Sequence, residues 1–106
     1  MIFKMASQVS VKQARQLLAE GAVVVDVRTP EEFAGGHLPQ AINIPLDQIE
    51  ARLPERIAGK FSPILLHCAS GMRSGTACDK LKAMGYTNAH NLGSYARAVE
   101  IVEQTA

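Results

Sequence analysis

The chain has 106 residues, of which 47% are hydrophobic and 20% are charged, and its formal net charge is +1. This size and composition are typical of one globular domain with a real core, so we expect residues 1–106 to form a single domain. A nearly neutral chain with no basic run or basic stripe argues against a nucleic-acid partner. No apolar segment approaches the ~20 residues that cross a bilayer, so we expect no membrane partner.

Apolar patterning predicts alternating strands and helices in the first part of the chain. After a short strand over residues 6–9, Ser10 caps a helix that Gly21 ends. The run 22–25 is continuously apolar and rich in β-branched residues. Such a run is typical of a strand that is buried on both faces, as in a parallel sheet. Thr29 then opens a second helix.

The second helix is predicted to be short, because glycines 35–36 stop it. Thr29 caps this helix, Pro30 occupies its first position, and Glu32 completes a capping box. A turn over residues 37–39 leads into a strand over residues 41–45, which ends at its proline.

The second half of the chain repeats the alternation. We expect a helix over residues 47–53 and a loop over residues 54–62 with a helical turn near 56–58. Further strands are predicted over residues 63–67 and 89–92, and further helices over 75–84 and from Ser94 onward. This order favours an α/β fold with a parallel sheet and helices on both faces.

The short stretch 67–74 carries the chemistry, because it places Cys68 between a strand and a helix. Gly71 allows a tight loop whose backbone N–H groups can bind an anion. The helix start and Arg73 add positive charge. A thiol in these surroundings ionises easily, and the thiolate is the nucleophile. The sequence therefore predicts a cysteine enzyme.

The expected topology brings a second candidate residue to the same place. Ligands of open parallel sheets bind at the carboxyl ends of the strands. Arg28 ends the strand that begins near Val23, and Cys68 ends the later strand over residues 63–67. Arg28 is therefore a candidate for substrate contact, although pairing with Asp26 is the more ordinary interpretation.

Three stretches resemble the rhodanese family of sulfurtransferases: residues 24–33, residues 36–45 and the loop 68–74. Residues 91–93 add to the resemblance, which covers almost the whole chain. It departs from the family pattern at Ser94 and Tyr95, where a second glycine and a tryptophan are common. The resemblance implies a rhodanese-like α/β fold with a parallel sheet of about five strands and helices on both faces.

The same resemblance implies an activity, that of a thiosulfate sulfurtransferase. Cys68 would take a sulfane sulfur from a small-molecule donor such as thiosulfate, become a persulfide, and pass the sulfur to a thiophilic acceptor such as cyanide or a thiol. Arg73 would hold donor oxygens or offset thiolate charge. No metal and no organic cofactor is needed, because the cysteine sulfur is the carrier. The substrate-binding loop would comprise Ala69, Ser70, Gly71, Met72 and Ser74.

Three other functions remain open. Thiol phosphatases also combine a cysteine, an amide loop and an arginine, but they have five residues between the two, whereas four separate Cys68 from Arg73 here. Some rhodanese-like domains are non-catalytic binding modules, although these typically lack the cysteine. A relay in which a partner protein donates or accepts the sulfur is a further alternative.

The other reactive side chains have more ordinary interpretations. We interpret Cys78 as structural, because it lies more than two helical turns beyond Cys68, too far for a disulfide. Two free thiols fit a reducing compartment, and residues 1–5 do not begin a signal peptide, so we expect a cytoplasmic protein. His37 is expected to be a structural hydrogen-bonding residue. His67 should point away from Cys68, because neighbouring strand residues face opposite sides. The histidines, at 37, 67 and 90, lack metal-site spacing.

Overall fold

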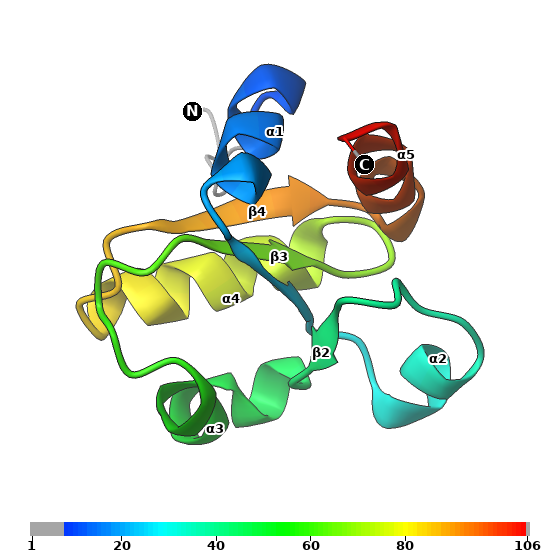
Figure 1. The fold of residues 1–106 in the computed structure, drawn as a ribbon. Coiled ribbons are helices and arrows are strands. Elements are labelled where there is room, and N and C mark those ends of the chain that lie inside the picture. Colours follow the sequence, from blue (N-terminus) through cyan, green and yellow to red (C-terminus); the bar gives the residue numbers. More distant parts are fainter. Residues whose placement is uncertain (1–7, 106) are drawn as a thin grey trace, which may run out of the picture.

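The computed structural model describes residues 8–105 as an α/β fold around a parallel sheet. The four strands lie in the order β2-β1-β3-β4, and each neighbouring pair is parallel (Figure 1). Their bounds are β1 (Val23–Asp26), β2 (Ile42–Asn43), β3 (Ile64–His67) and β4 (Ala89–Gly93). The prediction of a parallel sheet flanked by helices is confirmed.

The expected number of about five strands is not reached in residues 8–105. The predicted first strand covered residues 6–9, and residues 6 and 7 lie outside the described part of the chain. Within that part, Gln8 forms only an isolated parallel bridge with Asn91, and the Val9 amide donates to the Asn91 carbonyl oxygen at 2.9 Å. The segment therefore runs alongside β4 without forming a strand.

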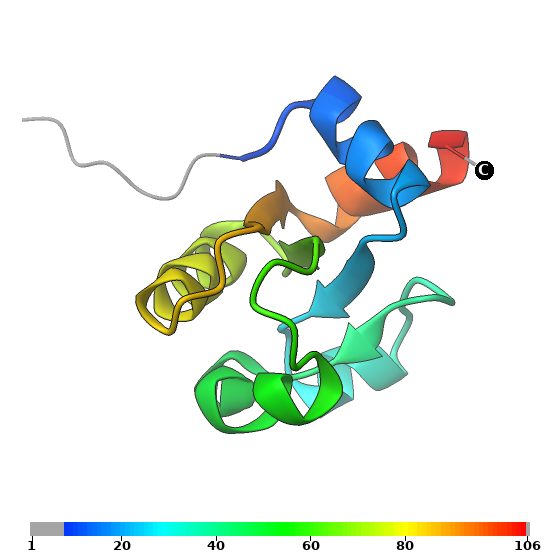
Figure 2. The same ribbon diagram turned by 60° about the vertical axis from the view of Figure 1, so that its left-hand side comes forward.

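Helices cover both faces of the sheet (Figures 1 and 2). Helices α1 (Val11–Ala19) and α5 (Tyr95–Thr105) lie together on one face. The opposite face carries α4 (Met72–Ala83) and α3 (Ile49–Arg56), and α3 is preceded by the 3-10 helix η1 (Leu46–Gln48). Helix α2 (Pro30–Ala34) lies on the side toward which the β3 and β4 arrows point. This arrangement leaves the carboxyl ends of the strands beside α2 and the start of α4.

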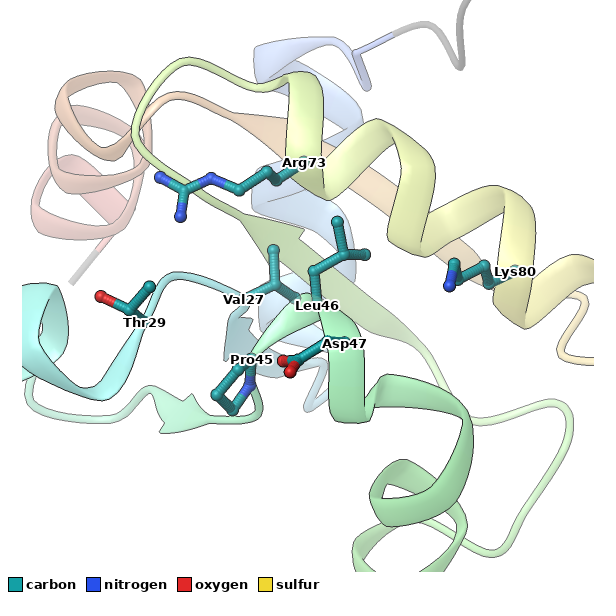
Figure 3. Close-up of a pocket in the computed structure, with 7 residues that line it drawn as sticks. All are labelled: Val27, Thr29, Pro45, Leu46, Asp47, Arg73 and Lys80. Atoms are coloured by element: carbon teal, nitrogen blue, oxygen red, sulfur yellow. The ribbon is translucent and has the colours of Figure 1, made fainter.

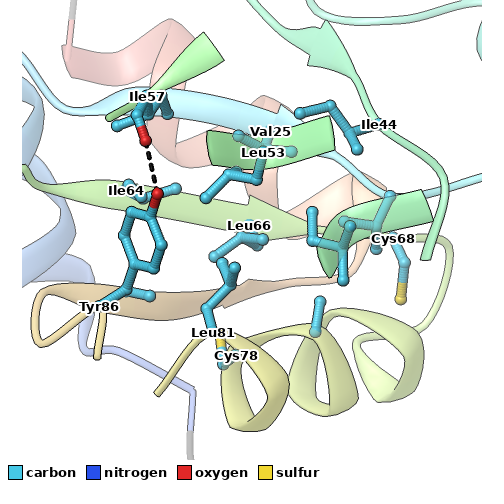
Figure 4. Close-up of a cluster of buried hydrophobic side chains, with 14 residues drawn as sticks. Val25, Ile44, Leu53, Ile57, Ile64, Leu66, Cys68, Cys78, Leu81 and Tyr86 are labelled. Carbon is cyan, nitrogen blue, oxygen red and sulfur yellow. Dashed lines mark hydrogen bonds between the residues drawn. The ribbon is translucent and has the colours of Figure 1, made fainter. Parts of the chain in front are cut away.

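The sheet separates two buried clusters, because neighbouring residues of a buried strand point to opposite faces. Val25 and Leu66 face α3 and α4, whereas Val24 and Leu65 face α1 and α5, and all four are at most 2% exposed. Both cysteines belong to the cluster under α3 and α4 (Figure 4). The continuous apolar runs of β1 and β3 are therefore explained by two-sided burial.

Two helix boundaries differ from the sequence predictions. Helix α3 continues through Pro54 to Arg56, where we expected a loop. A proline removes one backbone donor, and burial of Leu53 and Ile57 on either side of it holds the chain against the sheet. Helix α4 begins at Met72 instead of residue 75, because the left-handed backbone of Gly71 (φ 99°) closes the loop early.

Candidate active site

Cys68 directly follows β3, and the start of α4 wraps around its sulfur. The Cys68 amide continues the sheet by donating to the Gly93 carbonyl oxygen at 3.1 Å. The chain then folds back, so that the Gly71 amide donates to Cys68 Sγ at 3.0 Å and the Ser74 amide lies 3.4 Å from it. Two backbone donors of the loop and of the first helical turn therefore converge on one sulfur atom.

The surroundings of the Cys68 thiol act on its pKa in opposite directions. Burial disfavours the thiolate and raises the pKa. The Ser74 hydroxyl and the amides of Ser74, Gly71 and Ser70 favour the thiolate and lower the pKa. The net result is a Cys68 pKa below its ordinary value. A lowered pKa is the condition for a nucleophilic cysteine.

A buried polar network holds the loop in this shape. The Ser74 hydroxyl lies 2.7 Å from Asn91 Oδ1 and 3.5 Å from Cys68 Sγ, within hydrogen-bonding distance of both. Asn91 Nδ2 donates to the Gly71 carbonyl oxygen at 3.0 Å, and the Gly93 amide donates to Asn91 Oδ1 at 3.0 Å. Asn91 therefore ties β4 to the middle and the end of the cysteine loop, at Gly71 and Ser74. Asn91 received no role of its own from the sequence and was noted only as part of the stretch 91–93, which adds to the family resemblance.

Gly71 is required by close packing as well as by its backbone angle. A Cβ atom at this position would lie 3.0 Å from the Gln8 side-chain nitrogen and 3.4 Å from the Gly93 backbone. An antiparallel bridge between Ser70 and Ser94 fastens the loop at the same place. The loop is thus pressed against the junction of β4 and α5, which limits its freedom to open.

Arg73 has an ionic partner that the sequence did not reveal. Its guanidinium donates to both carboxylate oxygens of Glu32, at 2.7 and 3.0 Å. The hydrogen bonds from Arg73, and from Thr29 in the capping box, lower the pKa of Glu32 to about 2. Hydrogen bonding to Glu32 is the main cause that raises the pKa of Arg73, and the Cys68 sulfur adds to it. Glu32 was predicted only as a helix cap, because no local pattern pairs residues 41 positions apart.

The ion pair between Glu32 and Arg73 joins α2 to the start of α4. It lies near Cys68, which is buried. The Cys68 residue is 0% exposed, whereas the two side chains of the ion pair are about one-third exposed. Met72, which was predicted to belong to the substrate-binding loop, is the first residue of α4 and exposes 61% of its surface; its contact with substrate stays a prediction. Ala69 contributes its carbonyl oxygen, which accepts a hydrogen bond from the Tyr95 amide at 3.4 Å. Access to the sulfur therefore requires a movement of the groups around it.

Arg28 reaches the same edge of the sheet but turns to the other face. It forms a bidentate ion pair with Asp26, donates to the Gly36 carbonyl oxygen, and lies 4.4 Å above the Tyr95 ring. Pairing with Asp26, as the sequence suggested, is confirmed. These contacts use the guanidinium for structure, and a contact between Arg28 and substrate stays a prediction.

His67 shares this second face, as strand alternation predicted. Its ring stacks near Tyr95, with the centroids 5.7 Å apart, and burial lowers its pKa. Its Nε2 atom lies 3.7 Å from the Asp26 carboxylate without a hydrogen bond. The ring is fully buried and points away from Cys68, into the cluster of Asp26 and Arg28. His67 is therefore not placed to serve as a base for Cys68.

The remaining candidates have the structural surroundings expected of them. Cys78 is a free, buried thiol in the middle of α4, and burial raises its pKa to about 12. His37 Nδ1 lies 2.9 Å from the Leu38 carbonyl oxygen, and its ring stacks on Phe33.

Within residues 8–105, no group of three or more metal-ligating side chains could hold a metal ion. None of the helices in that part is long and apolar enough to span a bilayer.

Comparison with known proteins places this chain in a family. Residues 10–97 match the rhodanese-like domain, so the chain belongs to the rhodanese family. A relative in Escherichia coli, thiosulfate sulfurtransferase PspE, is 38% identical over 69 residues, which are 65% of this chain and 66% of that protein. The human thiosulfate:glutathione sulfurtransferase is 34% identical over 90% of this chain and 95% of its own length.

A solved structure agrees with the sequence comparison. The human single-domain sulfurtransferase TSTD1 superposes with a TM-score of 0.72 and 31% identity. The superposition covers 90% of this chain and 96% of that protein. The match spans nearly the whole of this relative, whereas the match to the Escherichia coli relative stops just short of two-thirds of its length.

Proposed function

We propose that this protein is a sulfurtransferase that carries a sulfane sulfur on Cys68, with thiosulfate or a similar small molecule as the donor. The observation that carries the proposal is the convergence of the Gly71 and Ser74 amides on a buried sulfur. These donors stabilise negative charge on the sulfur in a site that excludes water. The names of the relatives in Escherichia coli and human support the same reaction class.

The proposed loading step balances without a cofactor. The Cys68 thiolate attacks the outer sulfur of thiosulfate, and a new sulfur–sulfur bond forms. The bond between that sulfur and the sulfite group breaks, and sulfite leaves with the electron pair. A singly charged nucleophile and a dianion give a singly charged persulfide and a dianion. The loop amides and Arg73 offset this negative charge while the sulfur moves.

In the unloading step, the Cys68 sulfur is the leaving group instead of the nucleophile. A thiolate or cyanide attacks the outer sulfur of the persulfide, the sulfur–sulfur bond of the enzyme breaks, and Cys68 leaves as a thiolate. Because the loop holds the thiolate with preformed amide donors, Cys68 is a good leaving group as well as a good nucleophile. The acceptor becomes a persulfide or thiocyanate.

Glu32 would control the entry of the donor. Its carboxylate occupies the guanidinium of Arg73, and a pKa of about 2 keeps it ionised at physiological pH. An anionic donor would compete with Glu32 for Arg73 and would separate α2 from the start of α4. This competition supplies the movement that the fully buried Cys68 needs.

The four residues between Cys68 and Arg73 also weigh against a phosphatase, because a short loop makes a small anion cradle. A binding module without activity would not need amides around a thiol. We further propose a single-domain, cytoplasmic protein. A partner protein could serve as donor or acceptor in place of a small molecule.

Intact mass measurement after treatment with thiosulfate tests this proposal. We expect a gain of one sulfur that is lost when cyanide is added. The Cys68→Ser variant should gain nothing under the same conditions. A chain that gains no sulfur, or that instead hydrolyses a phosphate ester at Cys68, would overturn the assignment.

A further inference from the structure

The Ser74 hydroxyl has one hydrogen and three acceptors within reach. It lies 2.7 Å from Asn91 Oδ1, 3.2 Å from the Gly71 carbonyl oxygen and 3.5 Å from Cys68 Sγ. A hydroxyl has a single hydrogen to donate, so it cannot make a full hydrogen bond to all three. Ser74 and Cys68 are 0% exposed and Asn91 is 3% exposed, so burial keeps bulk water out of the choice. The surrounding protein groups therefore decide where this hydrogen points.

The Gly71 carbonyl oxygen is already occupied. Asn91 Nδ2 donates to it at 3.0 Å, and the Gly75 amide donates to it at 3.1 Å. These two bonds use both lone pairs of the oxygen. They also set the orientation of the Asn91 side chain, because its Nδ2 must face this carbonyl and its Oδ1 must face the Gly93 amide, 3.0 Å away. The hydroxyl hydrogen is left with two acceptors, Asn91 Oδ1 and Cys68 Sγ.

The charge on Cys68 decides between these two acceptors. A neutral sulfur is a weak acceptor, so the shorter contact with Asn91 Oδ1 holds the hydrogen while Cys68 is a thiol. A hydrogen bond to an ion is about twice as strong as one between neutral groups, so a thiolate attracts the hydrogen. Asn91 Oδ1 keeps its bond from the Gly93 amide when the hydroxyl turns away, so it is not left without a donor.

The other donors around Cys68 differ from the Ser74 hydroxyl. The amides of Gly71 and Ser74, at 3.0 and 3.4 Å from the sulfur, are held in place by the backbone. Arg73 lines a pocket of about 340 Å³ (Figure 3), and its guanidinium is paired with Glu32. Among these donors, the hydroxyl is the one that changes partner by rotation about a single bond.

We infer that Asn91 is a positioning residue for sulfur transfer: it holds the Ser74 hydroxyl hydrogen while Cys68 Sγ is neutral and yields it when Sγ carries negative charge. This inference rests on the proposed function and adds a moving donor to the same site. During loading, the negative charge passes from Sγ to the outer sulfur of the persulfide, and the hydroxyl returns to Asn91. During unloading, the electron pair of the broken sulfur–sulfur bond stays on Sγ, and the hydroxyl turns back to it. The hydrogen remains bonded to the Ser74 oxygen throughout, so no proton is transferred.

Nuclear magnetic resonance of the Asn91 side-chain amide tests the inference in the unmutated protein. Its signals should shift together with the pH step at which Cys68 ionises. They should return toward their starting positions when thiosulfate converts the thiolate to a persulfide. The side-chain amide of Asn43, which donates to the carbonyl oxygens of Asp26 and Arg28, is the internal control. The Asn43 signals should follow neither change.

The Ser74→Ala variant separates a turning hydroxyl from the electric field of the sulfur. Without the hydroxyl, the Asn91 signals should lose most of their step with Cys68 ionisation, whereas a shift caused by the field alone would remain. Thr76→Val removes a hydroxyl from an exposed position of the same helix and is the matched control. In this control the Asn91 signals should behave as in the unmutated protein.

The kinetics of Ser74→Ala supply a readout that a merely structural hydroxyl would not change in the same way. Unloading by cyanide should slow about three- to tenfold at each pH, because the leaving thiolate loses a donor and the difference between a charged and a neutral hydrogen bond is lost. Loading by thiosulfate should slow at neutral pH, where less thiolate forms, and recover at alkaline pH, where Cys68 is fully ionised. General damage to the loop would instead slow both steps at every pH.

The outcomes separate the two proposals. If loading is normal but the Asn91 signals ignore the Cys68 step, or follow it equally in Ser74→Ala, the turning hydroxyl is overturned and the sulfur carrier is not. Equal unloading rates in Ser74→Ala and Thr76→Val would overturn it as well. Failure of the unmutated protein to gain sulfur from thiosulfate would overturn the proposed function itself.

Discussion

The two cysteines of this chain are equally buried, but their thiol pKa values are shifted in opposite directions. Cys68 is 0% exposed and Cys78 is 1% exposed, and both belong to the buried cluster under α3 and α4 (Figure 4). Burial raises the pKa of Cys78 to about 12, whereas the pKa of Cys68 is lowered. The comparison shows that burial does not decide whether a thiol is reactive. The number of donors that point at the sulfur decides it.

Backbone geometry explains why only one of the two sulfurs has such donors. Cys78 lies within α4, where amides are committed to the helical hydrogen bonds. Cys68 precedes the helix, and the first amides of a helix have no partner inside it. The turn at Gly71 directs its own amide and that of Ser74 at the sulfur instead of at water.

The largest effect is expected from removing the Cys68 sulfur, and no effect is expected from removing the Cys78 sulfur. Cys68→Ser should abolish the gain of sulfur from thiosulfate, because a serine hydroxyl cannot form a persulfide. Cys78→Ala should load normally, because its sulfur receives no hydrogen bond within residues 8–105. Peptide mass analysis locates the added sulfur. Finding the added sulfur on Cys78 would contradict the claim that Cys68 is the reactive thiol.

A second test removes the positive charge beside Cys68. Arg73→Ala should slow thiosulfate-dependent turnover by ~10- to 1000-fold, the range for losing one donor that stabilises transition-state charge. Lys82→Ala removes a cation from an exposed position of the same helix and serves as the control. Steady-state kinetics of both variants measure the effect, and similar rates in the two would mean that Arg73 is structural only.

A third test alters the loop while leaving both sulfurs in place. Gly71→Ala introduces a side chain at φ 99° and against Gln8 and Gly93, which costs about 1–3 kcal/mol in backbone strain alone. If the loop shifts, Cys68 loses amide donors, its pKa rises, and the thiolate fraction at neutral pH falls. The loading rate should fall accordingly at neutral pH and recover at alkaline pH.

Gly35→Ala is the control for this variant. Gly35 has an ordinary φ of −74°, and an added Cβ atom would meet only contacts of 3.5 Å or more. Its loading rate should match that of the unmutated protein. If the loading rate of Gly71→Ala equals that of the control at every pH, the shape of the loop does not determine the reactivity of Cys68.

The smallest effect is expected from freeing Arg73. Glu32→Gln keeps an acceptor for the Thr29 cap but removes the negative charge that competes with the donor. The KM for thiosulfate should fall about two- to fivefold, in line with the strength of a partly exposed ion pair. A raised KM would show that Glu32 orients Arg73 for the donor instead of competing with it.

The sequence could predict the local part of the site and not its long-range part. The strand–loop–helix around Cys68 and the capping box of Thr29 depend on residues close together in the chain, and both are confirmed. The ion pair of Glu32 with Arg73 and the bond of Asn91 to Gly71 join distant segments. Only the tertiary packing of β4 and α2 against the loop reveals them.

For the fold, too, the sequence could predict the features that leave a local pattern but not those that depend on packing. The alternation of apolar runs predicted a parallel sheet with two covered faces, because two-sided burial leaves a direct pattern in the sequence. The start of α4 and the passage of α3 through Pro54 depend on packing and on one glycine angle, and both boundaries were predicted wrongly. The burial of Cys68 could not be read from a loop that looked polar.

A pH titration of thiolate absorbance in the unmutated protein, Cys68→Ser and Cys78→Ala tests the central claim most directly. Because the pKa of Cys68 is lowered, its thiolate should persist at pH values where an ordinary thiol is protonated. The thiol that remains in Cys68→Ser should ionise only near pH 12. The predicted result is a low-pH step that disappears in Cys68→Ser and survives in Cys78→Ala. A Cys68 step at or above the ordinary thiol value of ~8.5 would contradict the account.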